Sequence, residues 1–336
     1  MTEQRPPAPT LDAVAARAGV SRSVASRALN GAPHVSRDKR EAVRRAVQEL
    51  GYVPDTRARA LATRRSGTAA LVVSGEDPSI FADPFFAQVI VGLSAALEEG
   101  DLHLMLCLAA SERGRRRVEE LLRSRGTDGV MPMAMREGDP LLPVFAASEV
   151  PVVFGGLPPG PAPRWYVDVD NAGGARLATE HLLARGRRRV AMISGPADTE
   201  VSRARERGHR EALALAGREA LAPERGDFTE AGGAAAMSRL LERLPDADGV
   251  FAANDNMAAG ALRVLRAAGR DVPGDVSLVG FDDLDTARTR EPALTTVRQP
   301  VRALGRETAR MLLTVLGGGE ATPLILPTEL VVRSTS

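Results

Sequence analysis

The chain after residue 67 alternates short apolar runs with longer stretches whose apolar residues recur at helical spacing. The short runs are rich in Val, Leu and Ile and predict buried strands, whereas the longer stretches predict helices. Two series of predicted strands follow one another, namely 69–73, 103–108, 129–133 and 150–154, then 189–194, 250–253 and 276–280. The predicted helices include 85–99, 115–124, 172–185, 203–216 and 256–268. This alternation predicts an α/β architecture of parallel sheets covered on both faces and arranged as two lobes.

Polar residues follow two of the predicted strands directly. In α/β folds a ligand binds outside the carboxyl ends of the strands, which is where Asn254, Asp255 and Asp282 fall. Asp255 also stands at a helix start, so a capping role is the alternative for it. Phe85 and Phe86 open the first predicted helix, either as core residues or, in a chain with 3% aromatic residues, as a stacking platform.

Residues 9–64 follow another pattern, that of three short amphipathic helices. Thr10, Ser21 and Ser36 each stand directly before one of these stretches, and their side chains can cap the helices that follow. Two short helices joined by a tight turn predict a helix-turn-helix motif over 11–30. Any small helical bundle has similar spacing, so the pattern alone leaves that alternative open.

Charge separates these two parts of the chain. Residues 1–65 hold 13 Lys and Arg against 6 Asp and Glu, a net charge of +7, and the remainder holds 31 against 37, a net charge of −6. A basic head on an acidic body favours nucleic-acid contact confined to the head, with a solvated charged face as the alternative. The second predicted helix favours DNA, because Arg22, Ser23, Ser26 and Arg27 project from its apolar stripe and arginine suits guanine O6 and N7.

The first 62 residues also carry a family resemblance. The stretch PTLDAVAARAGVSRSVASRALNGAPHVSRDKREAVRRAVQELGYVPDTRARALA resembles the head of the LacI/GalR (lactose-repressor) family along its whole length. The resemblance implies an all-α DNA-binding domain over 9–64 with a hinge helix at about 55–64, which orders on the operator and wedges Leu61 into the minor groove. In the absence of DNA, an unstructured basic linker is an equally good interpretation of the same segment. The residues implied to contact DNA are Thr10, Ser21, Arg22, Ser23, Ser26, Arg27, Asn30, Ser36, Arg57 and Leu61.

The resemblance continues through the body in blocks such as DPFFAQVIVGL, SRARERGHREAL, VFAANDNMAAGALRVLRAAGRDVPGDVSLVGFDD and PALTTVRQPV. It implies a domain over 67–336 that looks like a periplasmic sugar-binding protein with crossed-over lobes. By that likeness the N-lobe takes about 67–167 plus 299–321, and the C-lobe takes about 168–298 plus 322–336. The residues implied to bind an effector are Phe85, Phe86, Arg205, Phe228, Asn254, Asp255, Asp282 and Gln299.

One departure from the family concerns the sugar. Many sugar-responsive members place an acidic residue after the strand that here reads VPVVFGG, whereas Gly155 and Gly156 supply no side chain. A mixture of carboxylate, guanidinium, amide and aromatic groups suits a polyol or a nucleoside-like ligand. Judged only from its position on a predicted helix, Arg205 would be a solvent-exposed residue rather than part of an effector site.

Other functional classes find little support in the sequence. There is no Gly-rich phosphate loop, no H-E-x-x-H, no G-x-S-x-G and no cysteine cluster, so we expect no catalytic residue, no metal and no cofactor. Cys107 is the one cysteine and reads as a structural thiol rather than a nucleophile. The first residues lack the apolar core of a secretory signal, and no run is long enough to span a membrane, so we expect a cytoplasmic protein.

These observations predict a sequence-specific transcriptional regulator that is not an enzyme. We expect a repressor that binds palindromic operator half-sites as a homodimer, or as a higher oligomer, and responds to a sugar or a related small polar effector. One alternative is a regulator of the same fold that has lost its effector response. Another is a solute-binding receptor, which the body alone would suggest.

Overall fold

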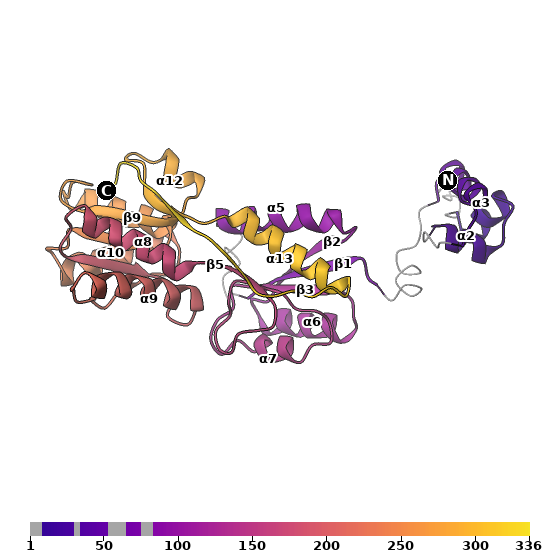
Figure 1. Cartoon of the computed structure of the whole chain (residues 1–336), viewed down its shortest axis with the longest axis horizontal. Helices are drawn as coiled ribbons and strands as arrows, with labels where there is room; N and C mark the ends of the chain where they lie inside the picture. Colours follow the sequence, from indigo (N-terminus) through magenta and orange to yellow (C-terminus); the bar gives the residue numbers. More distant parts are fainter. Residues whose placement is uncertain (1–8, 30–33, 53–64, 75–82) are drawn as a thin grey trace, which may run out of the picture. The chain divides into compact units, whose positions relative to one another are not determined.

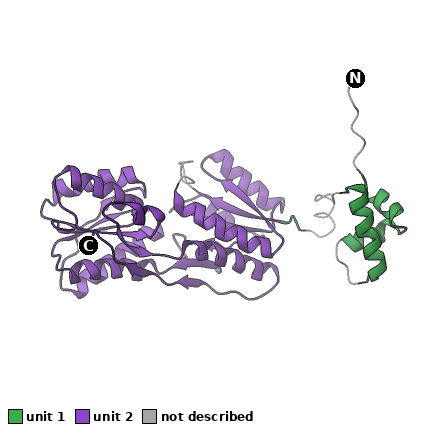
Figure 2. Cartoon of the chain, turned by 90° about the horizontal axis from the view of Figure 1, so that it is seen from above, with its two compact units in different colours: residues 1–67 green, residues 68–336 purple. Residues whose placement is uncertain are grey.

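The computed structural model describes residues 9–29, 34–52, 65–74 and 83–336. The chain divides into two compact units, residues 1–67 and residues 68–336, which are coloured separately in Figure 2. The predicted hinge helix at about 55–64, with Arg57 and Leu61, lies outside the described residues, as does Asn30.

The described part of the first unit contains three helices, α1 (Leu11–Arg17), α2 (Arg22–Leu29) and α3 (Arg37–Leu50). Their apolar faces meet in a small core that includes Val14, Ala25, Val43 and Ala46. Gly19 has a φ of 65°, a backbone conformation that side chains disfavour, and it turns the chain sharply between α1 and α2. Three packed helices with this short turn are the predicted helix-turn-helix arrangement.

The described part of the second unit contains two six-stranded sheets, and Figure 1 shows them with their helices. The first sheet has the strand order β11-β5-β4-β3-β1-β2, and the second has the order β12-β10-β9-β8-β6-β7. The strands of the first sheet are β1 (Thr68–Val73), β2 (His103–Leu108), β3 (Gly129–Met133), β4 (Phe154–Gly155), β5 (Tyr166–Val169) and β11 (Leu324–Leu326). The strands of the second are β6 (Val190–Ser194), β7 (Glu224–Arg225), β8 (Gly249–Ala252), β9 (Ser277–Asp282), β10 (Thr295–Arg298) and β12 (Glu329–Val331). All pairings are parallel except that of β10 with β12.

Helices cover both faces of the first sheet, as the sequence predicts. Ala69, Leu71 and Val73 of β1 belong to one buried cluster, and Ala70 and Val72 belong to another, because successive strand residues point to opposite faces. The helices around this sheet are α5 (Pro84–Glu99) and α13 (Val301–Leu316) on one face, with α6 (Glu112–Arg123) and α7 (Leu141–Ala146) on the other.

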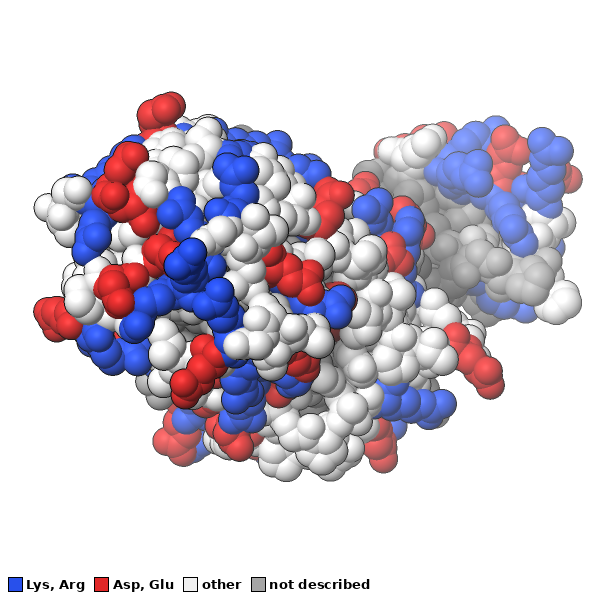
Figure 3. All heavy atoms as spheres, turned by 60° about the vertical axis from the view of Figure 1, so that its left-hand side comes forward, with Lys and Arg blue, Asp and Glu red and all other residues white. Residues whose placement is uncertain are grey.

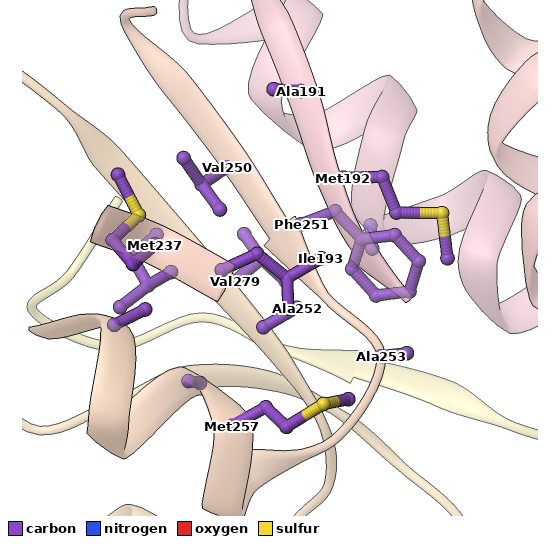
Figure 4. Close-up of a cluster of buried hydrophobic side chains, with 14 of the residues drawn as sticks. Ala191, Met192, Ile193, Met237, Val250, Phe251, Ala252, Ala253, Met257 and Val279 are labelled. Atoms are coloured by element: carbon purple, nitrogen blue, oxygen red, sulfur yellow. The ribbon is translucent and has the colours of Figure 1, made fainter. Parts of the chain in front are cut away.

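The second sheet is buried in the same way. Figure 4 shows Ile193, Phe251 and Val279 from the strands β6, β8 and β9, together with Met237 and Met257 from flanking helices. Full burial of three adjacent strands explains why their sequences read as continuous apolar runs. The helices around this sheet are α8 (Asn171–Ala184), α9 (Glu200–Leu215), α10 (Glu230–Arg243), α11 (Asp255–Ala267) and α12 (Asp285–Thr289).

The chain passes three times between the sheets, and this corrects two expected boundaries. The first crossover follows β5, which extends to Val169, and the second lies between β10 and α13 at Gln299. The third lies between β11 and β12, so residues 324–326 belong to the first sheet although we expected 322–336 in the C-lobe. The reason is that β11 pairs in parallel with β5 before the chain crosses over.

Two further expectations concern single elements. The apolar run 150–154 predicted a full strand, but only Phe154 and Gly155 form β4, preceded by one bridge between Val130 and Val152. Cys107 is half-buried on β2, and burial raises the pKa of its thiol. No helix in the described parts of the chain has the length and apolarity of a membrane span.

The surface of the second unit mixes both signs of charge. On the face shown in Figure 3, Lys and Arg side chains are interspersed with Asp and Glu side chains. Ion pairs account for part of this pattern, as Glu224 contacts Arg239 at 3.1 Å and Arg243 at 2.8 Å. The net negative charge of residues 66–336 is therefore not gathered into a single acidic patch on this face.

Candidate functional site

The exposed face of α2 is built by local hydrogen bonds at its start. The Ser21 hydroxyl accepts a hydrogen bond from the Val24 amide at 3.4 Å and lies 3.0 Å from the Ser23 hydroxyl. Arg22 is the first residue of the helix, and its side chain is 70% exposed with the Asp12 carboxylate 3.5 Å away. An exposed arginine at a helix start, beside two hydroxyl groups, can reach a base edge or a phosphate.

The rest of α2 keeps this face polar. Ala25 is fully buried in the head core, whereas Arg27 is exposed and donates from Nε to the Ser23 carbonyl oxygen at 3.2 Å. Ser26 is half-buried between these two faces. The helix therefore presents Arg22, Ser23 and Arg27 outward.

Thr10 and Ser36 occupy the N-cap positions of α1 and α3. The Thr10 hydroxyl accepts from the Ala13 amide at 3.3 Å, as predicted for a cap. Ser36 makes no such side-chain bond to the described residues of α3, which corrects the expectation that it caps this helix. Its exposed position at a helix N-terminus is one where phosphate binds readily, because the first amide groups lack partners within the helix.

The second unit contains a buried polar cluster at the carboxyl ends of its strands, centred on Arg205 of α9. The Arg205 guanidinium donates from Nε to Asn171 Oδ1 at 3.0 Å and from Nη1 to the Ala253 carbonyl oxygen. Its Nη2 lies 3.7 Å from an Asp282 carboxylate oxygen, and its plane covers the Phe281 ring at 3.6 Å. Arg205 is therefore a buried residue of the site rather than a solvated one.

Asp282 lies at the end of β9 in an unusual environment. Its φ is 117°, which is a strained backbone conformation for a residue with a side chain. Gln299 donates from Nε2 to its carboxylate. Burial raises the pKa of Asp282 to about 7, although the neighbouring Arg205 charge opposes that rise. The cluster therefore holds a carboxyl group that binds a proton much more tightly than an ordinary aspartate does.

Asn254 and Asp255 lie in the same region, but their side chains are hydrogen-bonded to other residues of the protein. Asn254 caps α11, with Oδ1 accepting from the Met257 amide at 2.9 Å and Nδ2 donating to the Phe228 carbonyl oxygen at 2.9 Å. The Asp255 carboxylate accepts from the Leu284 amide at 2.9 Å and from the Thr296 hydroxyl. Burial raises the pKa of Asp255, and the nearby Asp282 raises it further. The cap of α11 is therefore Asn254, which corrects the capping role expected for Asp255, and both side chains are engaged in hydrogen bonds within the protein.

The aromatic candidates have different environments. Phe86 is buried in the core of the first sheet, and Phe85 is half-buried with its ring perpendicular to that of Phe86 at a centroid distance of 5.3 Å. Phe228 has a φ of 69° and is half-buried against the second core. Phe85 and Phe228 are therefore only partly buried, whereas Phe86 belongs to the core.

The structure adds four polar residues that the sequence analysis did not single out. Asp83 caps α5 through the Phe85 amide and hydrogen-bonds Asn256 of the other lobe. Asp168 lies at the end of β5 and Asn171 begins α8, next to Arg205. The detectable signal for the last pair was the alternating segment YVDV followed by Asp170 and Asn171, a strand that leads into a helix.

The chemistry of this cluster favours a neutral ligand rich in hydroxyl groups. Asp168, Asp255 and Asp282 act on the charge of Arg205, and Asp83 acts on Asp282 in turn, so among the described residues of this cluster carboxyl groups outnumber the guanidinium. Carboxylates accept hydrogen bonds from hydroxyl groups and repel anions. Within the described residues no group of His, Cys, Asp and Glu has the arrangement of a metal site.

Comparison with known proteins agrees with this architecture. Residues 10–55 match the model of bacterial regulatory proteins of the lacI family, and residues 179–336 match that of a periplasmic binding protein-like domain. The HTH-type transcriptional regulator CelR of Thermobifida fusca is 46% identical over 97% of this chain and 98% of its own length. The chain belongs to the lacI family of bacterial regulatory proteins. Its relatives in that family are transcriptional regulators, in agreement with the regulator predicted from the sequence.

Two solved structures of this family cover nearly the whole chain. A complex of the transcriptional regulator CelR with cellobiose is 44% identical, has a TM-score of 0.77, and covers 98% of this chain and 100% of its own. A lac repressor dimer bound to operator and the anti-inducer ONPF is 29% identical, has a TM-score of 0.86, and covers 97% of this chain and 98% of its own. The predicted fold, a helix-turn-helix head followed by a two-lobed α/β domain with parallel sheets, is confirmed.

Proposed function

We propose that this member of the lacI family is a cytoplasmic repressor whose affinity for operator DNA is set by a sugar bound at the Arg205 cluster. The observation that carries the proposal is the buried contact of Arg205 with Asp282 at the carboxyl ends of the second sheet. A guanidinium and a carboxylate held side by side can bind adjacent hydroxyl groups of a sugar in a fixed orientation.

The proposed effector is a neutral glucoside of the size of cellobiose. The excess of carboxylates around Arg205 supports a ligand without negative charge. The full-length likeness to CelR, which is solved in complex with cellobiose, supports the disaccharide. Calorimetric titration of the full chain with cellobiose and with glucose 6-phosphate tests both points, and we expect heat of binding only for cellobiose.

We further propose that the repressor is a homodimer on palindromic half-sites. Leu106 on the edge strand β2 is 50% exposed, and Val91 on the neighbouring α5 is 53% exposed. An exposed apolar edge strand is a template for pairing with another chain, and a symmetric pair would cover both copies. The likeness to the lac repressor dimer on its operator supports the same assembly.

DNA reading is assigned in this proposal to the outward face of α2, with Arg22 contacting a base. Selection of binding sites from random DNA gives the operator, and Arg22→Ala should then relax the preference at one base pair per half-site by about 1 to 3 kcal/mol. Arg17→Ala is the matched control, since it removes one exposed arginine of α1 that is paired with Glu49 at 2.6 Å. If Arg22→Ala weakens binding to operator and to random DNA equally, as the Arg17→Ala control also would, Arg22 contacts only phosphate.

A second candidate function is DNA binding without an effector response. It is favoured by Gly155, the last residue of β4, and by Gly156 directly after it, because neither offers a polar side chain. A Cβ at Gly156 would meet no atom within 4 Å, so this position is open. The calorimetric titration separates the two functions, because only the effector-responsive repressor takes up a sugar.

A further inference from the structure

Asn171 stands between Arg205 and the first crossover of the chain. Its Oδ1 accepts the Nε–H of Arg205 at 3.0 Å. Its Nδ2 donates to Asp168 Oδ1 at 3.1 Å and to the Val169 carbonyl oxygen at 3.2 Å. Asn171 is buried and is the first residue of α8, so one amide side chain joins the start of the second lobe to the last strand before it.

Asp168 is in turn fixed within the first sheet. Its carboxylate accepts from the Leu157 amide at 3.1 Å and from the Val169 amide at 2.7 Å. In the sheet register Asp168 lies opposite Ile325 of β11, the strand that leads into the third crossover. The network from Arg205 through Asn171 to Asp168 therefore reaches two of the three segments that connect the lobes.

The second crossover is tied to the same pair from the other side. Gln299 lies between β10 and α13, and its Nε2 donates to Asp282, which is 3.7 Å from Arg205. The first and second crossovers thus meet the Arg205–Asp282 pair through one or two hydrogen bonds, and the third is reached through the pairing of Asp168 with β11. A ligand that pulls on Arg205 or Asp282 acts directly on the segments that must bend when the lobes move.

We propose that Asn171 is a positioning residue that fixes the Arg205 guanidinium for the effector and couples its position to the crossovers, and thereby to the arrangement of the two lobes. This inference rests on the proposed function, because it assigns regulation to the same site. The two halves of the amide have separate tasks: Oδ1 orients Arg205, and Nδ2 links that orientation to Asp168.

The physical reason is the hydrogen-bonding demand of a buried guanidinium. Arginine has five N–H donors in a fixed fork, so satisfying Nε with a rigid acceptor sets the direction in which both Nη groups point. Without Oδ1 the Arg205 side chain can rotate toward another carboxylate, since Asp168, Asp255 and Asp282 all surround it. A ligand shifts an equilibrium only by its different affinity for two arrangements, so a loosened link between site and crossovers weakens regulation.

The contrasting explanation is that Asn171 only starts the helix α8. Asp170 provides the matched control, because its exposed carboxylate caps α8 by accepting from the Gly173 amide at 2.8 Å. Asp170→Ala weakens the same helix start without a side-chain contact to Arg205. Asn171→Asp keeps an oxygen that can accept from Arg205 but replaces the amide donor that Asp168 requires.

The experiment uses the full chain, cellobiose as the probe, and operator DNA selected from a random pool. Cellobiose affinity is measured by calorimetry, and operator affinity is measured with and without cellobiose. We expect Asn171→Ala to weaken cellobiose binding about tenfold or more, and Asn171→Asp to keep its affinity within about threefold while losing most of the cellobiose effect on operator binding. Asp170→Ala should lower the melting temperature and leave both quantities unchanged. Equal effects of Asn171→Ala and Asp170→Ala would overturn the proposal.

A second measurement needs no effector. Spin labels replace Arg116 on α6 and Arg263 on α11, both exposed, in a Cys107→Ser background, and pulsed electron resonance gives the distance distribution between the lobes. We expect a broader distribution in Asn171→Ala and Asn171→Asp than in the unaltered chain and in Asp170→Ala. An unchanged width overturns the positioning role. A lack of cellobiose binding by the unaltered chain would contradict only the proposed function, because the distribution still decides the inference.

Discussion

His209 gives the stability of the second unit a specific dependence on pH. Its ring on α9 is 2% exposed, with Nδ1 2.9 Å from the Thr179 hydroxyl and its centroid 6.2 Å from that of Phe251. Within the described residues its Nε2 is buried without a hydrogen-bond partner. Burial disfavours the imidazolium, and the nearby Arg210 charge adds to the effect, so the pKa of His209 falls to about 4.

The sign of the effect follows from proton binding. An unfolded histidine has a pKa of about 6.5, so below that pH the unfolded chain takes up a proton that the folded chain refuses. Stability is therefore complete above about pH 6.5 and falls as the pH decreases toward about 4. Linkage between these two pKa values gives a loss of about 2 kcal/mol at about pH 5, approaching about 3 kcal/mol at about pH 4.

The assay is urea unfolding followed by circular dichroism at about pH 7.5 and about pH 5, comparing the unaltered chain with His209→Gln. The variant loses packing at both pH values, but its stability relative to the unaltered chain should rise by about 2 kcal/mol at the lower pH. His103→Gln, on an exposed residue of β2, is the control for removing a histidine. Parallel pH dependences of His209→Gln and the unaltered chain would show that protonation of His209 does not limit stability at low pH.

Two further predictions concern packing and the contact between lobes. A Cβ at Gly208 of α9 would overlap the Ala172 carbonyl oxygen of α8, so Gly208→Ala should lower the unfolding free energy by about 1 to 3 kcal/mol in thermal melts, and an unchanged melting temperature would disprove this close contact. Arg136 follows β3 and lies 3.1 Å from Asp198, which follows β6, so this exposed ion pair joins the two lobes. We expect Asp198→Arg to weaken cellobiose binding by about two- to fivefold, and the additional change Arg136→Asp to restore it. If the double variant binds cellobiose as weakly as the single variant, the ion pair does not contribute.

The fold was predictable where burial alone determines the sequence. Strands β1, β3, β6, β8 and β9 are covered on both faces, and each appears in the sequence as a continuous apolar run. Strand β11 was missed because it is a three-residue edge strand with largely exposed side chains. Helix α10 was missed because its Ala- and Gly-rich sequence, EAGGAAAMSRLLER, has little contrast between apolar and polar positions.

The candidate site was predictable only in part. The family resemblance named Arg205, Asp282 and Gln299, and the structure brings these three side chains together. Their role in effector binding stays a prediction. Asp168 and Asn171 were missed because the segment YVDV indicates a strand that leads into a helix, but does not indicate that the chain crosses between the sheets beside Arg205.

The residues predicted to contact DNA show the same limit. The exposure of Arg22 and Arg27 follows from the helical spacing of the buried Ala25, so it could be read from the sequence. The missing cap of Ser36 could not, because a serine before a helix favours a capping bond without ensuring it.

The most direct test of the account is the affinity of the full chain for its selected operator, measured with and without cellobiose at constant salt. We expect tight binding to a palindromic site, with an affinity that changes by about tenfold or more when cellobiose saturates the protein, and we expect Arg205→Ala to abolish this change. Equal operator affinity with and without a saturating amount of bound cellobiose would contradict the claim that the Arg205 cluster regulates DNA binding.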